Sequence, residues 1–174
     1  TNDIGWLLKS LNPIFSTPPN GTISGFGNCQ LQATWRGPFL PSDLKPALAR
    51  SLNATARVSA ENVAVTGSPF LVGLVNALAE GRANDLIAIA PTDVVVKNGL
   101  ITYQGMAMRI GNLTVIFSGT TDLVRETVNM TMVAPFPSAV ARSNAKVAKF
   151  LPTTITVPVK GPLADPKVDW GGAI

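Results

Sequence analysis

The sequence contains no histidine. Histidine is the commonest general base in enzymes, the usual partner of a serine or cysteine nucleophile, and the commonest zinc ligand. The carboxylates lie mostly at expected caps and turns, where acidic side chains are usually solvated or bound to backbone amides. A carboxylate pair for glycoside hydrolysis stays open, since pairing in space cannot be deduced from the sequence. The sequence therefore predicts a protein that is not an enzyme and that holds no metal ion or cofactor.

Cysteine occurs once, at Cys29. A single cysteine excludes an internal disulfide, so burial of apolar side chains and backbone pairing must hold the fold together. Without a histidine to take its proton, Cys29 lacks the usual base of a thiol nucleophile. We expect it to be a small, buried or half-buried side chain.

Charged residues make up 14% of the chain, against about 25% in an average soluble domain. Lys and Arg give a formal net charge of +4, but they are scattered singly and never form the basic run that is typical of a nucleic-acid patch. We therefore expect no nucleic-acid partner. Thr, Ser, Asn and Gln take the place of charge, a composition common in secreted and envelope proteins.

Long apolar runs are also lacking. No run approaches the roughly 18 residues that a membrane-spanning helix needs. The chain begins Thr1-Asn2-Asp3, without a methionine or the layout of a signal peptide. We therefore interpret residues 1–174 as a single domain and as a fragment of a longer protein, so that any membrane anchor or export signal would lie outside this sequence.

Alternation of apolar and polar residues predicts β-strands along much of the chain. We expect them at residues 22–35, 54–65, 94–96, 101–103, 106–110, 113–117, 128–132 and 155–159. Asn98-Gly99 is the strongest hairpin signal, and residues 111–112 and 119–122 are predicted as the next turns. Gly25 and Gly27 predict a bulge or close packing early in the first strand, and the alternation that resumes out of step after Gly105 predicts another bulge. Connections this short make the strands antiparallel neighbours.

Apolar residues at helical spacing, preceded by capping residues or proline, predict about four short helices. We expect them at residues 4–11, 44–52, 70–78 and 139–150. The predicted fold class is α+β, in which a curved antiparallel β-sheet carries these short helices packed on or beside it. One face of the sheet is predicted to be apolar.

The tail of the chain resembles a known family. It contains Leu151-Pro152 and then Ile155-Thr156-Val157-Pro158-Val159-Lys160-Gly161-Pro162-Leu163-Ala164-Asp165-Pro166-Lys167-Val168. This stretch is similar to the closing signature of AsmA-like proteins, a strand that ends in Gly-x-Leu and is followed by Asp-Pro-Lys and an apolar residue. The preceding order is also similar, with an Asn-Gly hairpin after residues 94–97 and a Gly-x-x-Asp-Leu element at residues 119–123. The resemblance covers residues 52–174 and concerns the C-terminal region of that family.

The resemblance implies a Gram-negative-type inner-membrane protein whose large periplasmic part reaches toward the outer membrane. Family members are linked to outer-membrane biogenesis and are thought to guide phospholipids along an apolar groove formed by curved sheets. The chain is accordingly expected to be a non-catalytic periplasmic domain, anchored to the inner membrane through a segment outside this sequence. Phospholipid acyl chains and other envelope proteins are its expected partners.

Seven apolar residues on the predicted strands are the candidate lipid-binding residues. They share the apolar face of the sheet, and the flexible methionines among them suit a variable apolar guest. They are Met106, Met108, Val115, Phe117, Val128, Met130 and Met132. The alternative is a closed core covered by the helices predicted at residues 70–78 and 139–150. For any one of these residues taken singly, a place in a core is the more common role.

Two other functions stay open. The chain could be a purely structural or protein-interaction module that caps a longer periplasmic β-structure, with exposed edge strands that pair with neighbouring segments. It could be a hydrolase if carboxylates cluster in a cleft, although no residue pattern requires this. Bound phospholipid would favour lipid handling, whereas a lipid-free, closed sheet would favour the structural module.

Overall fold

The computed structural model describes residues 23–34, 53–66, 68–78, 86–136 and 152–172. The helices predicted at residues 4–11, 44–52 and 139–150 lie outside these ranges. Within them, no helix has the length and apolar character that crossing a membrane requires.

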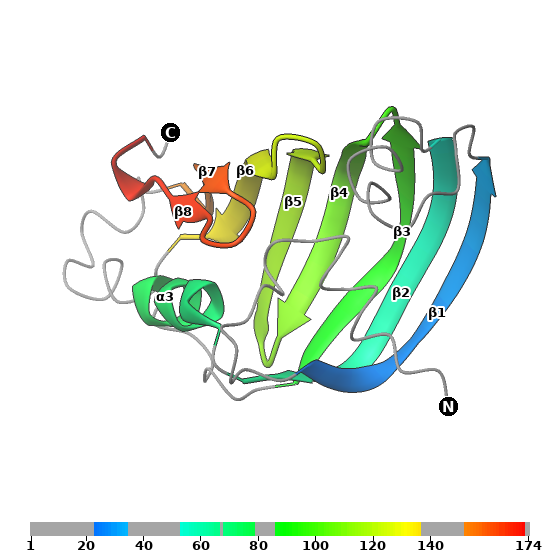
Figure 1. The fold of residues 1–174 in the computed structure, drawn as a ribbon. Helices are drawn as coiled ribbons and strands as arrows, with labels where there is room; N and C mark the ends of the chain where they lie inside the picture. Colours follow the sequence, from blue (N-terminus) through cyan, green and yellow to red (C-terminus); the bar gives the residue numbers. More distant parts are fainter. Residues whose placement is uncertain (1–22, 35–52, 67, 79–85, 137–151, 173–174) are drawn as a thin grey trace, which may run out of the picture.

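One antiparallel sheet of eight strands dominates the described part of the chain. Each strand pairs with the next one in the sequence, so the sheet is a meander from β1 to β8 (Figure 1). The strands are β1 (Ile23–Thr34), β2 (Asn53–Val65), β3 (Ile87–Lys97), β4 (Leu100–Ile110), β5 (Leu113–Asp122), β6 (Thr127–Pro135), β7 (Thr154–Pro162) and β8 (Lys167–Val168). The other elements are helix α3 (Pro69–Leu78) and the short 3-10 helix η2 (Trp170–Gly172).

The alternation of side chains explains why these segments form strands. In β2, Ala54, Ala56 and Val58 are buried, and the residues between them are exposed. The same pattern continues through the longer strands that follow. Because successive side chains of a strand point to opposite faces, one face of the sheet is apolar and buried and the other is mostly polar. The sequence predicted this one-sided sheet.

The hairpin between β3 and β4 is formed as predicted. Lys97 pairs with Leu100, and Asn98 and Gly99 make the turn between them. These two turn residues have φ values of 50° and 79°. Positive φ at both central positions is the geometry of a type I′ turn, which favours Asn-Gly.

The predicted bulges are confirmed by shifts in the strand register. The pairing of β1 with β2 shifts between Ser24 and Phe26, on either side of a glycine. The pairing of β4 with β5 shifts between Tyr103 and Met106, and Gly105 lies within that gap. In β4, Met106 and Met108 are buried after the shift as Ile101 and Tyr103 are before it, so the bulge keeps apolar side chains on the buried face.

The turn predicted at residues 119–122 is wrong, because these residues belong to β5 and the chain turns at residues 123–126. Gly119 has a φ of 141°. A Cβ atom on Gly119 would lie 2.5 Å from the carbonyl oxygen of Asn129 and 2.6 Å from the Cα atom of Met130. Glycine is therefore required for the close approach of β6 rather than for a reversal of the chain.

The predicted fold class, α+β with about four short helices, is also wrong. The described residues contain eight strands and a single α-helix of 10 residues, so this part of the chain is predominantly β-sheet. The physical reason is that the strands are longer than their sequence signals. Gly119, expected in a turn, lies inside β5, and β3 begins at Ile87, before the alternation predicted at residues 94–96. The antiparallel pairing of neighbouring strands was predicted correctly.

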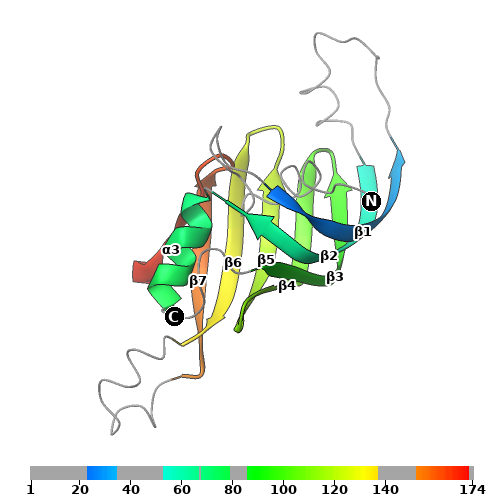
Figure 2. The same ribbon diagram turned by 90° about the horizontal axis from the view of Figure 1, so that it is seen from below.

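Helix α3 confirms the helix predicted at residues 70–78. The buried Ser68 caps it, because its Oγ accepts a hydrogen bond from the N–H of Leu71 at 3.4 Å. Pro69 occupies the first helical position, where its missing N–H is not needed. The buried apolar side chains of α3 belong to the same hydrophobic cluster as the strands and are Phe70, Leu71, Leu74, Val75 and Leu78. The helix lies at the β6–β7 end of the sheet (Figures 1 and 2).

Candidate functional site

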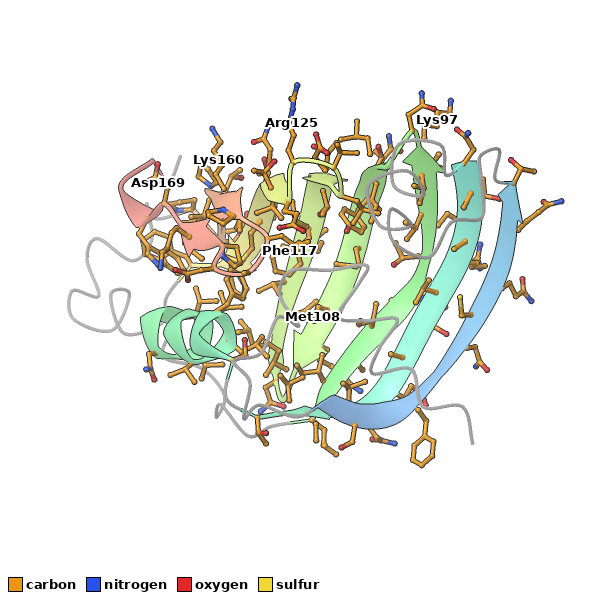
Figure 3. The ribbon with its side chains drawn as sticks, in the orientation of Figure 1. Lys97, Met108, Phe117, Arg125, Lys160 and Asp169 are labelled. Carbon is orange, nitrogen blue, oxygen red and sulfur yellow. The ribbon has the colours of Figure 1, made fainter. Side chains whose placement is uncertain are left out.

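The structure brings the seven candidate residues together on the adjacent strands β4, β5 and β6. Met106 pairs with Phe117, which pairs in turn with Met132, and Met108 lies opposite Val115. Directly opposed side chains have Cβ atoms about 5 Å apart, so the residues form one continuous apolar surface. The sheet is curved, and Met108 and Phe117 point toward the inside of the curve (Figure 3).

The candidate residues are all buried. Their exposed fraction is at most 5%, at Met106, and it is 0% at Met108 and Phe117. The chain therefore covers this face itself, and helix α3 contributes apolar side chains to the same cluster. A guest molecule can reach the face if part of that cover moves.

Methionine is concentrated on this face. The chain contains 4 methionines, and all of them are buried there: Met106, Met108, Met130 and Met132. The unbranched thioether side chain has three rotatable bonds and adapts its shape to its neighbours. A surface built from such side chains can repack around apolar molecules of different shape.

Tyr103 and Thr121 place two hydroxyl groups on the same face, although neither belongs to the seven candidate residues. Both are at most 1% exposed. The Tyr103 hydroxyl donates a hydrogen bond to Thr121 Oγ1 at 3.1 Å, which gives a partner to each buried hydroxyl. Burial raises the pKa of Tyr103, and the hydrogen bond with Thr121 opposes this effect. Because 18 residues separate the two side chains, no local signal in the sequence identifies the pair.

The apolar face changes character toward β1. The buried side chains of β2 are alanines and valines, and the alanines are Ala54, Ala56 and Ala60. Cys29 lies opposite Val58, so its side chain belongs to the apolar face, yet it is exposed. The expectation of a buried or half-buried Cys29 is therefore wrong. The physical reason is that β1 is the first strand of the sheet and has a described neighbour on one side only.

The polar face carries shallow depressions over β1, β2 and β3. Two of them, of about 500 and 250 Å³, share Gln32, Thr55 and Val95 in their linings. Arg57 and Asp93 line the larger depression and form an ion pair at 3.1 Å, with 58% and 74% of their side-chain surfaces exposed. Ion pairs this exposed contribute little to stability. Neither lining includes a candidate lipid-binding residue.

The tail motif turns the chain back onto β7. The N–H of Leu163 donates a hydrogen bond to the carbonyl oxygen of Glu126 at 2.7 Å. The N–H of Asp165 donates one to the carbonyl oxygen of Pro162 at 3.1 Å. The carboxylate of Asp165 pairs with the ammonium group of Lys167 at 2.6 Å. After this turn the chain returns as β8. The motif therefore has a structural role in closing the sheet.

Comparisons with known proteins give no match: neither a protein-family model, nor a curated protein, nor a solved structure is similar to the chain at a significant level. The AsmA-like family therefore stays a prediction from the tail residues. In the part of the chain that the structure describes, no three cysteine or acidic side chains gather closely enough to hold a metal ion.

Proposed function

We propose that the chain is a non-catalytic periplasmic domain of an AsmA-like envelope protein that takes part in outer-membrane biogenesis or in phospholipid transport between membranes. Its own contribution is to hold acyl chains against the apolar face of β4, β5 and β6. The observation that carries the proposal is the concentration of all 4 methionines, together with Phe117, on one face of three neighbouring strands.

An acyl chain matches this face in size and chemistry. A strand of six residues is about 20 Å long, which is comparable to the extended acyl chain of a phospholipid. Burial of one methylene group contributes about 0.8 kcal/mol. Ten methylenes held on the face would therefore contribute roughly 8 kcal/mol, before the free energy of moving the cover is subtracted.

Helix α3 is the part of the cover that we expect a lipid to displace. Its buried apolar side chains join the sheet in one cluster. Its capping hydrogen bonds, from Leu71 and Val72 to Ser68, lie within its own first turn and survive a displacement of the helix as a unit. Exchanging helix side chains for an acyl chain replaces one apolar contact by another, so the net free-energy change is small.

A purely structural module is the second candidate function, and the burial of the seven residues favours it. A face on which Met108, Val115, Phe117 and Met132 are 0% exposed is complete without a guest. In that case the domain would cap a longer periplasmic β-structure. Bound phospholipid distinguishes the two functions.

Native mass spectrometry and organic extraction test the proposal, after the purified chain has been mixed with phospholipid vesicles and separated by gel filtration. Lipid handling predicts stoichiometric phospholipid in the protein fraction. A lipid-free wild-type chain that unfolds cooperatively would refute lipid handling and leave the structural module.

A double variant localises the lipid on the face. Changing Met108 and Met130 together to Leu conserves volume but removes two flexible side chains, and we expect bound lipid to fall by about threefold or more. Ile116→Leu is the matched control, because Ile116 lies on the opposite face of β5 and is 40% exposed. Equal lipid content in the double variant and the control would place the lipid elsewhere.

A further inference from the structure

Arg109 differs from the other two arginines that the structure describes. Arg57 pairs with Asp93 at 3.1 Å, and Arg125 pairs with Asp122 at 3.8 Å. Within the described residues Arg109 forms no ion pair, and it lies exposed on the polar face of β4. A guanidinium group carries five N–H donors in a fixed fork and no acceptor. Arg109 can therefore bind an anion without first giving up a carboxylate.

Arg109 lines a depression of about 380 Å³ on the polar face. The lining residues come from β2, from β3 and the residue before it, and from β4 and the turn after it; they are Asn62, Leu86, Ile87, Ala88, Arg109, Gly111 and Asn112. None of these described lining residues is acidic. One water molecule takes up about 30 Å³ in the liquid, so the depression can hold an anion together with the organic group that carries it.

The short side chain of Ala88 explains why the sheet is hollow here. On one side Ala88 lies opposite Arg109 of β4. On the other side the pairing of β2 with β3 shifts between Ala60 and Val63, so that two residues of β2 face Ala88 alone. This two-to-one arrangement is a β-bulge. A methyl group therefore lies between longer side chains on both neighbouring strands and leaves space above it.

The bulge also brings the amide group of Asn62 to the depression. Asn62 has a φ of 53°, in the left-handed region that asparagine adopts more readily than most residues. The two bulge residues, Glu61 and Asn62, are both exposed, but of the two only Asn62 lines the depression. Glu61 lies opposite Phe26 of β1. Because Ala88 separates the two strands, Asn62 and Arg109 stand on opposite sides of the depression.

The turn between β4 and β5 supplies a second amide group. Ile110 pairs with Leu113, so Gly111 and Asn112 are the two central residues of the turn. Gly111 has a φ of 57°, and Asn112 is not among the residues with positive φ. Positive φ at the first central position alone is the geometry of a type II′ turn, which favours glycine there. The turn thereby sets Asn112 into the lining beside Arg109.

We infer that this depression binds a phosphate monoester, carried by a small soluble molecule or by a lipid headgroup. The guanidinium fork of Arg109 binds two of the phosphate oxygens side by side. The amides of Asn62 and Asn112 donate to the third oxygen. A carboxylate has two oxygens, both of which the fork occupies, so it uses the three donor groups less completely. Leu86, which is 52% exposed in the lining, contacts the organic part of the ligand.

An NMR titration of the isotope-labelled chain with glycerol phosphate tests this inference. The signals to follow are the side-chain amides of Asn62 and Asn112 and the Nε–H of Arg109. We expect them to shift saturably, with a dissociation constant in the millimolar range or below. Glycerate, which has a carboxylate in place of the phosphate, should bind about fivefold more weakly or worse at the same ionic strength. Glycerol should cause no saturable shift.

Two changes at Arg109 separate its charge from its shape. Arg109→Gln removes the charge at an exposed position, and we expect the affinity for glycerol phosphate to fall about tenfold or more. Arg109→Lys keeps the charge but loses the fork, so its affinity should stay about threefold or more below that of the wild type. Arg57→Gln is the matched control, because Arg57 is also exposed on the polar face but pairs with Asp93. It should bind as the wild type does, and urea denaturation checks that each variant folds.

Vesicle flotation distinguishes the two sources of the phosphate. Binding to phosphatidylcholine vesicles that contain phosphatidic acid, lost in Arg109→Gln, identifies a lipid headgroup as the ligand. Binding of glycerol phosphate without such vesicle binding identifies a soluble ester.

Three results would overturn the inference: no Arg109-dependent binding of either probe, equal losses in Arg57→Gln and Arg109→Gln, or equal affinity for glycerate. The depression shares no residue with the seven candidate lipid-binding residues, which lie on the opposite face of the sheet. Acyl-chain binding is measured there by extraction, so either proposal can fail without the other.

Discussion

The two ends of the sheet differ in packing and in the way their edges finish. Toward β7 the buried face carries large side chains such as Phe117 and Met132, and the final strand has two residues. Toward β1 the buried residues of β2 include Ala54, Ala56 and Ala60, and the edge strand has 12 residues without proline or charge. Both ends belong to one continuous sheet, so the difference in packing occurs within a single ladder of hydrogen bonds.

The two ends of the sheet therefore contribute differently to the stability of the fold. Large buried side chains remove more apolar surface from water, so β4 to β7 supply most of the hydrophobic stabilisation. The alanine-rich end supplies less, and among the described strands only β2 pairs with β1. A change at the packed end should therefore lower the free energy of unfolding, whereas removing an exposed side chain at the β1 end should change it little.

The largest expected effect comes from removing the same aromatic side chain at each end. Phe117→Ala removes a fully buried ring, at 0% exposure, and we expect it to lower the free energy of unfolding by about 3–5 kcal/mol. Phe26→Ala removes a ring that is 59% exposed on β1, and its effect should stay within about 0.5 kcal/mol. Urea denaturation of the two variants measures both. Equal losses would contradict the difference between the ends.

A glycine at the packed end gives the next effect. Gly119→Ala introduces a Cβ atom 2.5 Å from the carbonyl oxygen of Asn129 at a φ of 141°, and we expect a loss of about 2–4 kcal/mol. In helix α3, a Cβ on Gly73 meets nothing within 4 Å. Gly73→Ala is therefore expected to stabilise by about 0.5–1 kcal/mol through helix propensity. Thermal denaturation measures the stability of the two variants. A Gly119→Ala variant as stable as the wild type would show that β6 does not approach Gly119 as closely as the structure places it.

Tyr103 gives a smaller effect that depends on pH. Burial raises its pKa in the folded state above the unfolded value, which is about 10. The resulting stabilisation is complete below about pH 10 and is lost as the pH rises further, because the unfolded chain ionises first. The chain contains one tyrosine, so tyrosinate absorbance reports this group alone. We expect no tyrosinate until the chain unfolds.

Tyr103→Phe separates the hydrogen bond from the ionisation. Removing the hydroxyl should cost about 1 kcal/mol at neutral pH, since Thr121 loses its partner. Above about pH 10 the free energy of unfolding of the variant should fall less steeply than that of the wild type. Phenylalanine has no phenol that could ionise in the unfolded chain. Parallel urea titrations at neutral and alkaline pH measure this. Identical alkaline slopes would contradict the burial of the phenol.

The smallest change in stability is expected when the charged residue of β8, the last strand in the described sheet, is replaced. The side chain of Lys167 in β8 is 73% exposed. Lys167→Val removes its charge and should change the free energy of unfolding by less than about 0.5 kcal/mol. Self-association should nevertheless rise, because a charge that discourages edge pairing is gone. Light scattering against concentration measures it. A variant as monomeric as the wild type would mean that strand length alone protects this edge.

Much of the sheet could be predicted because its signals are local. Period-two alternation located the strands, and Asn98-Gly99 located a hairpin whose φ values require those residue types. The candidate residues on β4, β5 and β6 fell on one face because alternation fixes which side chains share a face. Whether that face holds lipid depends on what covers it, and alternation carries no information about a cover.

What could not be predicted depends on contacts between distant residues. Gly119 has the sequence appearance of a turn, and its role emerges from the approach of β6 at Asn129. Cys29 was expected to be buried or half-buried from its residue type. Its exposure results from the position of β1 as the first strand of the described sheet, which no local pattern indicates. The hydrogen bond between Tyr103 and Thr121 joins two strands, and the sequence around either residue does not predict it.

Photo-crosslinking tests the central claim, that the apolar face of β4, β5 and β6 holds acyl chains, most directly. The purified chain is incubated with vesicles that contain a phospholipid with a diazirine in its acyl chain, irradiated, digested and examined by mass spectrometry. Lipid handling predicts adducts concentrated in residues 106–110, 113–117 and 128–132. Adducts confined to exposed apolar residues such as Trp170, which is 37% exposed, or the absence of adducts, would contradict the claim and identify the face as a closed core.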